Sequence, residues 1–367
     1  MTALKDFLLQ NPPLSLALGG LAIGFLFGFL VYRTNFCTMG SISDMMTFGD
    51  YRRFRAWLLA GATAMLGTQL LQYYGAVSLT RSMYLGANLN WFGNIVGGLL
   101  FGFGMVFAGG CASRNLARAG GGDLRSLLSL LVVGLFAYMA IGGLLGPIRA
   151  TLEQWTTLSL TPLKLPSQSL GDVLSVVAGL SSRQASLIMG SVIALLMALY
   201  CFKDASFRSS PVHVISGLGI GLCVVLGWGL TGLAFDEMAE RPTQPISLTY
   251  VRPTGDAIEW LQRFTAARMP GFGVASVFGA MLGAFIAAIS MGRFQVTTFS
   301  DKGDTLRNLF GAMLMGIGGV MALGCTVGQA ITGISTLAMG SFLTFAAIVV
   351  GGRWGMKVFE RILLGDD

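Results

Sequence analysis

The chain has 367 residues, of which 54% are hydrophobic and only 11% are charged, and its mean hydropathy is +0.71. A soluble domain carries about 25% charged residues, so this composition excludes an ordinary water-soluble protein and predicts an integral membrane protein. The formal net charge of +7 would suit a partner of nucleic acids or acidic substrates, but the positions of the basic residues explain it more simply.

Eight stretches without Asp, Glu, Lys or Arg mark the predicted membrane segments: residues 14–32, 56–80, 92–110, 126–148, 184–202, 209–235, 269–292 and 308–352. A helix needs about 20 apolar residues to cross the hydrocarbon, so the last stretch holds two spans and the others one each. The first stretch is too long for a signal peptide and is followed by Arg33 instead of a cleavage site. The sequence therefore predicts an all-α polytopic membrane protein with about nine transmembrane helices.

The basic residues alternate between the two sides of the predicted membrane. With the N-terminus outside, the inner loops hold 15 of the 24 Lys and Arg residues, although the outer loops are longer in total. This positive-inside pattern predicts an outer N-terminus and a cytoplasmic C-terminus. Two long outer connections, residues 147–184 and 234–270, interrupt the spans, and the segment "DAIEWLQRFTAARM" of the second is typical of a helix on the outer interface.

Two segments of the chain repeat each other. The stretches 97–111 and 311–325 agree at eight of fifteen positions and end on Cys111 and Cys325, and Asn94 matches Asn308 further upstream. On the span count the two copies run in opposite directions, a plan that many transporters use to build a site at the middle of the membrane. We therefore predict one transporter domain over residues 1–367, with repeat halves 1–146 and 185–367.

Glycines immediately before the repeated cysteines predict breaks in two helices. Most glycines of these runs, such as Gly98 and Gly102, are typical of close packing between membrane helices. Gly110 and Gly324 differ because they precede a cysteine and a polar stretch. A break there frees backbone groups that lipid cannot satisfy, so it is tolerated where it lines a cavity. We expect short helices from about Ala112 and Thr326 to point their N–H groups at that cavity, which favours an anion.

The cysteines divide into two groups by position. Cys201 and Cys223 lie inside apolar runs and are typical of small buried core residues. Cys111 and Cys325 end the repeated runs, where a neutral, polarizable thiol suits a soft anion with negative charge on sulfur. Cys37 follows a similar transition in "VYRTNFCTMGS" but has no cysteine partner in the second copy, so its position alone leaves both readings open.

No metal or other cofactor is indicated, because the cysteines form no Cys-x-x-Cys pair and His213 is the single histidine. Arg33 and Arg114 could attract an anion near Cys37 and Cys111, although the general pattern favours membrane anchors. No Asp or Glu lies within a predicted span, so the carboxylate relay of a proton-driven carrier is missing.

At these residues the chain resembles the YeeE/YedE family of membrane proteins with the sulphur-transport domain. The resemblance rests on "RTNFCTMG", "GGCASRN" and "GCTVGQ", in this order within a glycine-rich repeat. It implies a thiosulfate uptake protein of the bacterial inner membrane, with an hourglass-like bundle and short re-entrant helices. It also implies that Cys37, Cys111 and Cys325 line a central path and hydrogen-bond the substrate transiently, which resolves the role of Cys37.

The resemblance further implies a cytoplasmic partner, a TusA-like sulfur-carrier protein, although the C-terminal tail is too short for a fusion. Related members handle selenium or other sulfur compounds. The alternative function is a membrane sulfurtransferase or thiol oxidoreductase that uses a cysteine persulfide. Such an enzyme needs a thiolate activated by a base or cation, and His213 is far from each cysteine motif in sequence. We therefore expect a transporter and not an enzyme, and no partner among nucleic acids.

Overall fold

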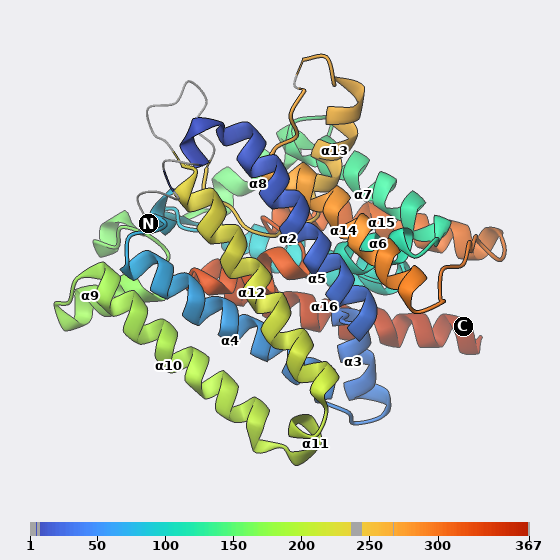
Figure 1. Ribbon diagram of the computed structural model, residues 1–367, viewed down its shortest axis with the longest axis horizontal. Coiled ribbons are helices and arrows are strands. Elements are labelled where there is room, and N and C mark those ends of the chain that lie inside the picture. Colours follow the sequence, from blue (N-terminus) through green and yellow to red (C-terminus); the bar gives the residue numbers. More distant parts are fainter. Residues whose placement is uncertain (1–4, 6–7, 236–243, 267, 366–367) are drawn as a thin grey trace.

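The computed structural model describes residues 5, 8–235, 244–266 and 268–365 (Figure 1). Nine long helices occupy this part of the chain: α2 (Pro12–Thr34), α4 (Arg52–Tyr73), α5 (Trp91–Phe107), α7 (Leu124–Ile141), α10 (Ser182–Lys203), α12 (Pro211–Leu233), α14 (Phe272–Ser290), α15 (Lys302–Met321) and α16 (Met339–Leu364). Each predicted apolar stretch coincides with one of them, and the last stretch with two. The all-α fold class is confirmed.

The long helices fit the dimensions of a bilayer. In the described part of the chain, seven helical segments are long and apolar enough to cross a membrane. The helices α4 and α15 have similar lengths, 22 and 20 residues, but begin with charged residues. The protein is therefore a multi-pass membrane protein.

Shorter elements connect the long helices. They are η1 (Leu79–Arg81), α3 (Thr38–Thr47), α6 (Ala112–Gly120), α8 (Gly146–Thr156), η2 (Thr161–Leu163), α9 (Leu170–Ala178), α11 (Ala205–Arg208), α13 (Arg252–Gln262) and the π-helical η3 (Gly328–Gly333). Among the described residues the strands are confined to one antiparallel pair, β1 (Asn88–Leu89) with β2 (Leu158–Ser159). The helix predicted over 256–269 in the second connection exists in part as α13. It begins four residues earlier, because Pro253 suits a first helical turn, and it already ends at Gln262.

The helices pack in pairs that join the two halves. The helix α2 packs on α14 and α4 on α12, while α5 packs on α16 and α7 on α15. At the centre, α5 also packs on α15. In Figure 1, α10 lies at one edge of this bundle beside α4. The contact of α2 with α14 has its counterpart in that of α12 with α4, and the contact of α5 with α16 has its counterpart in that of α15 with α7.

Glycines allow the closest of these contacts. A Cβ atom at Gly28 of α2 would collide with the carbonyl of Ala280 in α14, and one at Gly102 of α5 would collide with the carbonyl of Ile348 in α16. Small residues let the backbones of membrane helices approach closely, and dispersion contacts then stabilise the pair. The glycine-rich faces therefore hold the two halves together around the centre of the molecule.

Candidate functional site

Three cysteines begin three short helices. Cys37 is the N-cap of α3 and Cys111 is the N-cap of α6, while Cys325 directly precedes the helical turn that starts at Thr326 and continues into η3. The Sγ atom of Cys37 accepts a hydrogen bond from the Gly40 N–H at 3.4 Å, and that of Cys325 accepts one from the Gly328 N–H at 3.3 Å. Helix N-caps usually carry Ser, Thr, Asp or Asn. Here thiols hold that position, where the helix dipole favours an anion.

The backbone breaks before Cys111 and Cys325 have related but unequal geometry. Gly109 and Gly110 have φ angles of +69° and +156°, which favour glycine. In the second repeat the residue aligned with Gly109 is Leu323, which has a φ angle of +59°. Gly324 instead lines a cavity. The two predicted breaks exist, and the left-handed residue of the second one precedes the predicted glycine.

Side-chain amides brace both breaks. Asn115 and Gln329 each stand four residues after a repeated cysteine. The Asn115 Nδ2 atom donates to the Gly110 carbonyl at 3.1 Å, and the Gln329 Nε2 atom donates to the Ala322 carbonyl. Carbonyls freed by the breaks thus obtain partners inside the protein, which a membrane interior requires.

The three capping thiols form a row. Cys37, Cys111 and Cys325 are 7%, 1% and 0% exposed. The Cys111 thiol is within electrostatic range of both Cys37 and Cys325, so we describe the three thiols as a row with Cys111 in the middle. Its Sγ atom lies 3.2 Å from the Ser113 hydroxyl. The structure brings together three cysteines that lie as much as 288 positions apart in the sequence.

The other two cysteines have different surroundings. The Cys201 thiol donates to the Arg55 carbonyl at 3.2 Å, where α10 packs on α4. Cys223 is fully buried in α12, within electrostatic range of the Tyr250 hydroxyl. Neither caps a short helix. Their positions agree with the core role that the sequence indicates.

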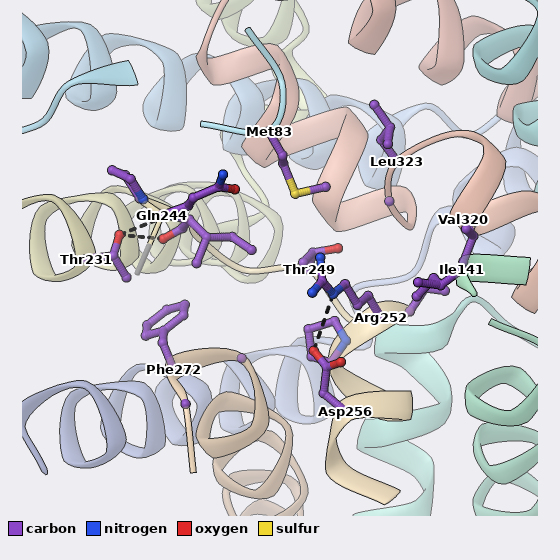
Figure 2. A pocket seen from close by; sticks show the side chains of 18 of the residues that line it. Met83, Ile141, Thr231, Gln244, Thr249, Arg252, Asp256, Phe272, Val320 and Leu323 are labelled. Carbon is purple, nitrogen blue, oxygen red and sulfur yellow. Dashed lines mark hydrogen bonds and ion pairs between the residues drawn. The ribbon is translucent and has the colours of Figure 1, made fainter. Parts of the chain in front are cut away.

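A cavity of about 820 Å³ reaches the Cys325 end of the row (Figure 2). We call it the α13 cavity, because Arg252, Pro253 and Asp256 of α13 form part of its wall. Its lining includes Gly324, directly before Cys325, and Thr249, whose Oγ1 atom lies 4.0 Å from the Cys325 Sγ atom. The cavity thus reaches the residues next to the third thiol.

Charged groups of the α13 cavity are paired. Arg252 and Asp256 form an ion pair at 3.7 Å, which Figure 2 draws as a dashed line. The Tyr138 hydroxyl donates to Asp256 at 2.6 Å. Burial raises the pKa of Asp256 above its ordinary value, against the opposing effects of Tyr138 and Arg252. The wall therefore carries a carboxyl group that gains a proton more easily than usual.

A second cavity, of about 430 Å³, carries an excess of positive charge. We call it the arginine cavity, because its lining includes Arg33, Arg114, Arg118, Arg125 and Arg293 beside Asp123. Asp123 pairs with Arg118 at 2.6 Å and with Arg125 at 3.2 Å. Burial alone would raise the pKa of Asp123, but these two arginines hold it below its ordinary value. One carboxylate cannot neutralise this lining, so the cavity attracts anions.

The two cavities lie at opposite ends of the bundle. On α2, Leu16 lines the α13 cavity while Tyr32 lines the arginine cavity, and on α7 the corresponding residues are Ile141 and Arg125. Each pair is separated by sixteen positions, or about 24 Å along a helix. This distance is most of the roughly 30 Å thickness of the hydrocarbon. Gly324, next to Cys325, lines the first cavity, and Arg114, within electrostatic range of Cys37 and Cys111, lines the second.

Arg33 is exposed, as a membrane anchor is expected to be, whereas Arg114 is half-buried. Both line the arginine cavity, and Arg114 is within electrostatic range of Cys37 and Cys111. The positive-inside pattern alone favoured headgroup anchors, because it gives the side of the membrane but not the direction of a side chain. The short helix α6, which starts at Ala112, carries Arg114 into the interior beside the thiols.

Sequence reasoning missed the polar groups around Cys325. Thr249, Tyr250 and Tyr84 lie in connections, and only the fold places them beside the repeated motif. The sequence feature that could have indicated them is the presence of polar side chains within apolar stretches of the connections. Thr249 and Tyr250 follow the apolar pair Ile246 and Leu248, which belong to no predicted span.

Comparison with known proteins agrees with this architecture. The sequence pattern of the sulphur transport family matches residues 33–354. The chain belongs to this family. A thiosulfate transporter TsuA from Spirochaeta thermophila is 30% identical over 93% of the chain and 99% of the relative. The thiosulfate transporter TsuA of Escherichia coli is 27% identical over 92% of the chain and 93% of the relative.

Other relatives in the family match a shorter part of the chain. The probable transporter YedE of Escherichia coli is 32% identical over 111 residues, which are 30% of this chain and 25% of the relative. The family match begins at Arg33 and ends at Trp354, so it contains all three capping cysteines and both repeated segments, 97–111 and 311–325.

Proposed function

We propose that this membrane protein takes up thiosulfate, or a similar soft sulfur anion, along a path lined by neutral thiols. The path runs from the α13 cavity past Cys325, Cys111 and Cys37 to the arginine cavity. The observation that carries the proposal is the row of three buried thiols between two cavities at opposite ends of the bundle. Two relatives that cover nearly the whole chain bear the name thiosulfate transporter.

The chemistry of the row suits a mobile anion. Thiols are weak hydrogen-bond donors, and the N-termini of α3 and α6 add the positive end of a helix dipole without a fixed charge. Conduction requires binding that is favourable enough for entry and weak enough for release. Gly110 and Gly324 shape the path, Gly110 through its backbone conformation and Gly324 as a cavity-lining residue without a side chain.

The positive-inside pattern gives the direction of the path. It assigns the arginine cavity to the cytoplasm of a bacterial cell, together with the C-terminus, and the α13 cavity to the outer side with the N-terminus. In this arrangement residues 1–146 and 185–367 are the two repeat halves, and residues 147–184 and 234–270 are the outer connections. The helix α13 belongs to the second connection, in agreement with an outer α13 cavity.

The arginines at the cytoplasmic end attract the anion by charge, and a TusA-like sulfur-carrier protein is the proposed recipient there. Arg114 also favours the alternative function, because a cation near Cys37 and Cys111 stabilises a thiolate. A sulfurtransferase would then carry sulfur as a cysteine persulfide. The two functions differ in whether the substrate leaves the protein chemically unchanged.

Reconstituted liposomes test the proposal. Radiolabelled thiosulfate should accumulate in liposomes that contain the protein and not in empty ones, and the label should be recovered as thiosulfate. Competition experiments show which anions share the path: sulfate, sulfite or selenite is added in excess, one at a time, and the decrease in thiosulfate uptake is measured. A protein that fails to move thiosulfate, or one that releases a different sulfur species, would contradict the proposed function.

A further inference from the structure

Two buried tyrosine hydroxyls near Cys325 lack a partner in the part of the chain that the structure describes. Tyr250 is 0% exposed and Tyr84 is 1% exposed, yet neither phenolic oxygen has a hydrogen-bond partner among these residues. Leaving a buried polar group unsatisfied costs about 1–3 kcal/mol, and such groups are rare in native proteins. A role toward a ligand explains why a fold would keep tyrosine at both positions.

Both tyrosines lie near the same thiol. Tyr250 and Tyr84 are each within electrostatic range of Cys325. The residue before Tyr250, Thr249, has its Oγ1 atom 4.0 Å from the Cys325 Sγ atom. The residues before the two tyrosines, Met83 and Thr249, line the α13 cavity and come from different segments of the chain (Figure 2). The tyrosines therefore approach the inner end of that cavity from two directions.

Aromatic contacts hold the two rings in place. The Tyr250 ring lies 5.0 Å from the Phe27 ring, and the Tyr84 ring lies 6.3 Å from the ring of Trp228 in an edge-to-face arrangement. The Trp228 Nε1 atom in turn donates to the Ser335 hydroxyl at 3.1 Å. Each tyrosine ring is thus held against a buried aromatic neighbour, so the hydroxyl donors are preorganised.

A third unpartnered hydroxyl belongs to Thr326, which follows Cys325 and is 0% exposed. The surroundings of this thiol therefore combine one sulfur with several free O–H groups. An anion that carries both sulfur and oxygen presents matching acceptors. A thiol is a weak donor, whereas an O–H group that donates to a charged oxygen makes a short and strong hydrogen bond.

We propose that Tyr250 and Tyr84 donate hydrogen bonds to the sulfonate oxygens of the substrate while Cys325 contacts its terminal sulfur. The inference rests on the proposed transport of thiosulfate and names the chemical class that the Cys325 step accepts, a tetrahedral thio-oxyanion. Tyrosine suits this task because it stays neutral and offers a strong donor without a charge that would trap the anion. The two residues therefore select for a substrate that carries oxygen atoms at the end opposite its terminal sulfur.

Conservative substitutions test this assignment in the full-length protein in liposomes. Tyr250→Phe and Tyr84→Phe remove only the hydroxyl and keep the ring packing. We expect each to lower the kcat/KM of thiosulfate uptake by about tenfold or more, chiefly through a raised KM. The thermal unfolding temperature should stay the same or rise, because an unsatisfied hydroxyl is removed.

Tyr138→Phe is the matched control, because the Tyr138 hydroxyl has protein partners, Asp256 and Glu259, both at 2.6 Å. It should lower the unfolding temperature and leave the KM near that of the parent protein. If Tyr250→Phe and Tyr84→Phe transport like the parent while Cys325→Ala is inactive, the tyrosine assignment is wrong and the transport function stands. Losses of uptake that follow losses of stability would also overturn the assignment. A parent protein without thiosulfate uptake refutes the proposed function itself.

Discussion

Asn115 and Gln329 make the same kind of bond in the two repeats, each donating its amide to a carbonyl at the break before a cysteine. Both side chains are buried, at 0% and 1% exposure. Their shared place, four residues after Cys111 and Cys325, shows that the repeat extends beyond the matching glycines into the short helices. The breaks are therefore held by specific side chains and are not loose ends of the long helices.

Removing one of these amides should destabilise the fold. Asn115→Ala leaves the Gly110 carbonyl and the Ser126 hydroxyl without the amide partner that they have now. The cost of losing such buried hydrogen bonds is about 1–3 kcal/mol. Thermal unfolding in detergent should show a clear decrease in stability, whereas Asn11→Ala, which removes a longer and solvent-exposed N-cap hydrogen bond, should cost less. Equal stability of both variants would show that the amide does not hold the break.

The glycines before the cysteines should matter more for transport than for stability. A Cβ atom at Gly324 would meet its nearest neighbour at 3.4 Å, an ordinary contact, but Gly324 lines the α13 cavity, where we expect an added methyl group to narrow the path. At Gly110 a Cβ atom meets Arg114 at 3.1 Å, and the φ angle of +156° disfavours alanine. Gly324→Ala should therefore lower the transport rate with little loss of stability, and Gly110→Ala should lower the rate with a modest loss.

Gly98→Ala provides the contrast, because its Cβ atom would lie 2.7 Å from the Ala347 Cβ atom and 2.9 Å from the Thr344 carbonyl. Overpacking between helices costs about 1–3 kcal/mol. This variant should lose stability and retain its transport rate at temperatures where it is folded. If the rates of all three variants simply follow their unfolding temperatures, these glycines serve packing and the account of the breaks is wrong.

The sequence predicted the helices, the breaks and the repeat because these depend on local properties: the length of apolar stretches, the spacing of glycines and the identical residues of the two repeated segments. It could not predict that Cys37, which lacks a repeated partner, lies next to Cys111, because this contact depends on the packing of α3 within the bundle. Tertiary structure also decides that Arg114 lies within electrostatic range of Cys37 and Cys111, and that Tyr84 and Tyr250 lie near Cys325. Family resemblance, and not position, pointed to Cys37.

Serine substitutions separate the two proposed chemistries. Cys111→Ser and Cys325→Ser keep a donor but lose the polarizable sulfur, so they should retain at most part of the uptake rate. During turnover with thiosulfate, intact-protein mass spectrometry should find no added sulfur on the parent protein. An adduct of one sulfur atom that forms and disappears during turnover would favour the persulfide mechanism.

Stability should depend on pH through Asp256. Because burial raises its pKa in the folded state, the folded protein binds more protons than the unfolded chain above the ordinary value of 3.8. This group's contribution therefore becomes less favourable as the pH rises from that value through the raised pKa. As the pH rises through this window, the parent protein should lose stability relative to the Asp256→Asn variant, which has no carboxyl group at this position. A difference that is independent of pH would show that Asp256 titrates normally.

The central claim is that three thiols in a row carry the anion between the two cavities. The most direct measurement is the initial rate of labelled thiosulfate uptake into liposomes that contain Cys37→Ala, Cys111→Ala or Cys325→Ala, with Cys201→Ala and Cys223→Ala as controls of the same chemistry. Each of the first three should lower the rate strongly at equal protein content and unfolding temperature, and the two controls should remain close to the parent protein. Equal tolerance of alanine at all five positions would contradict the account.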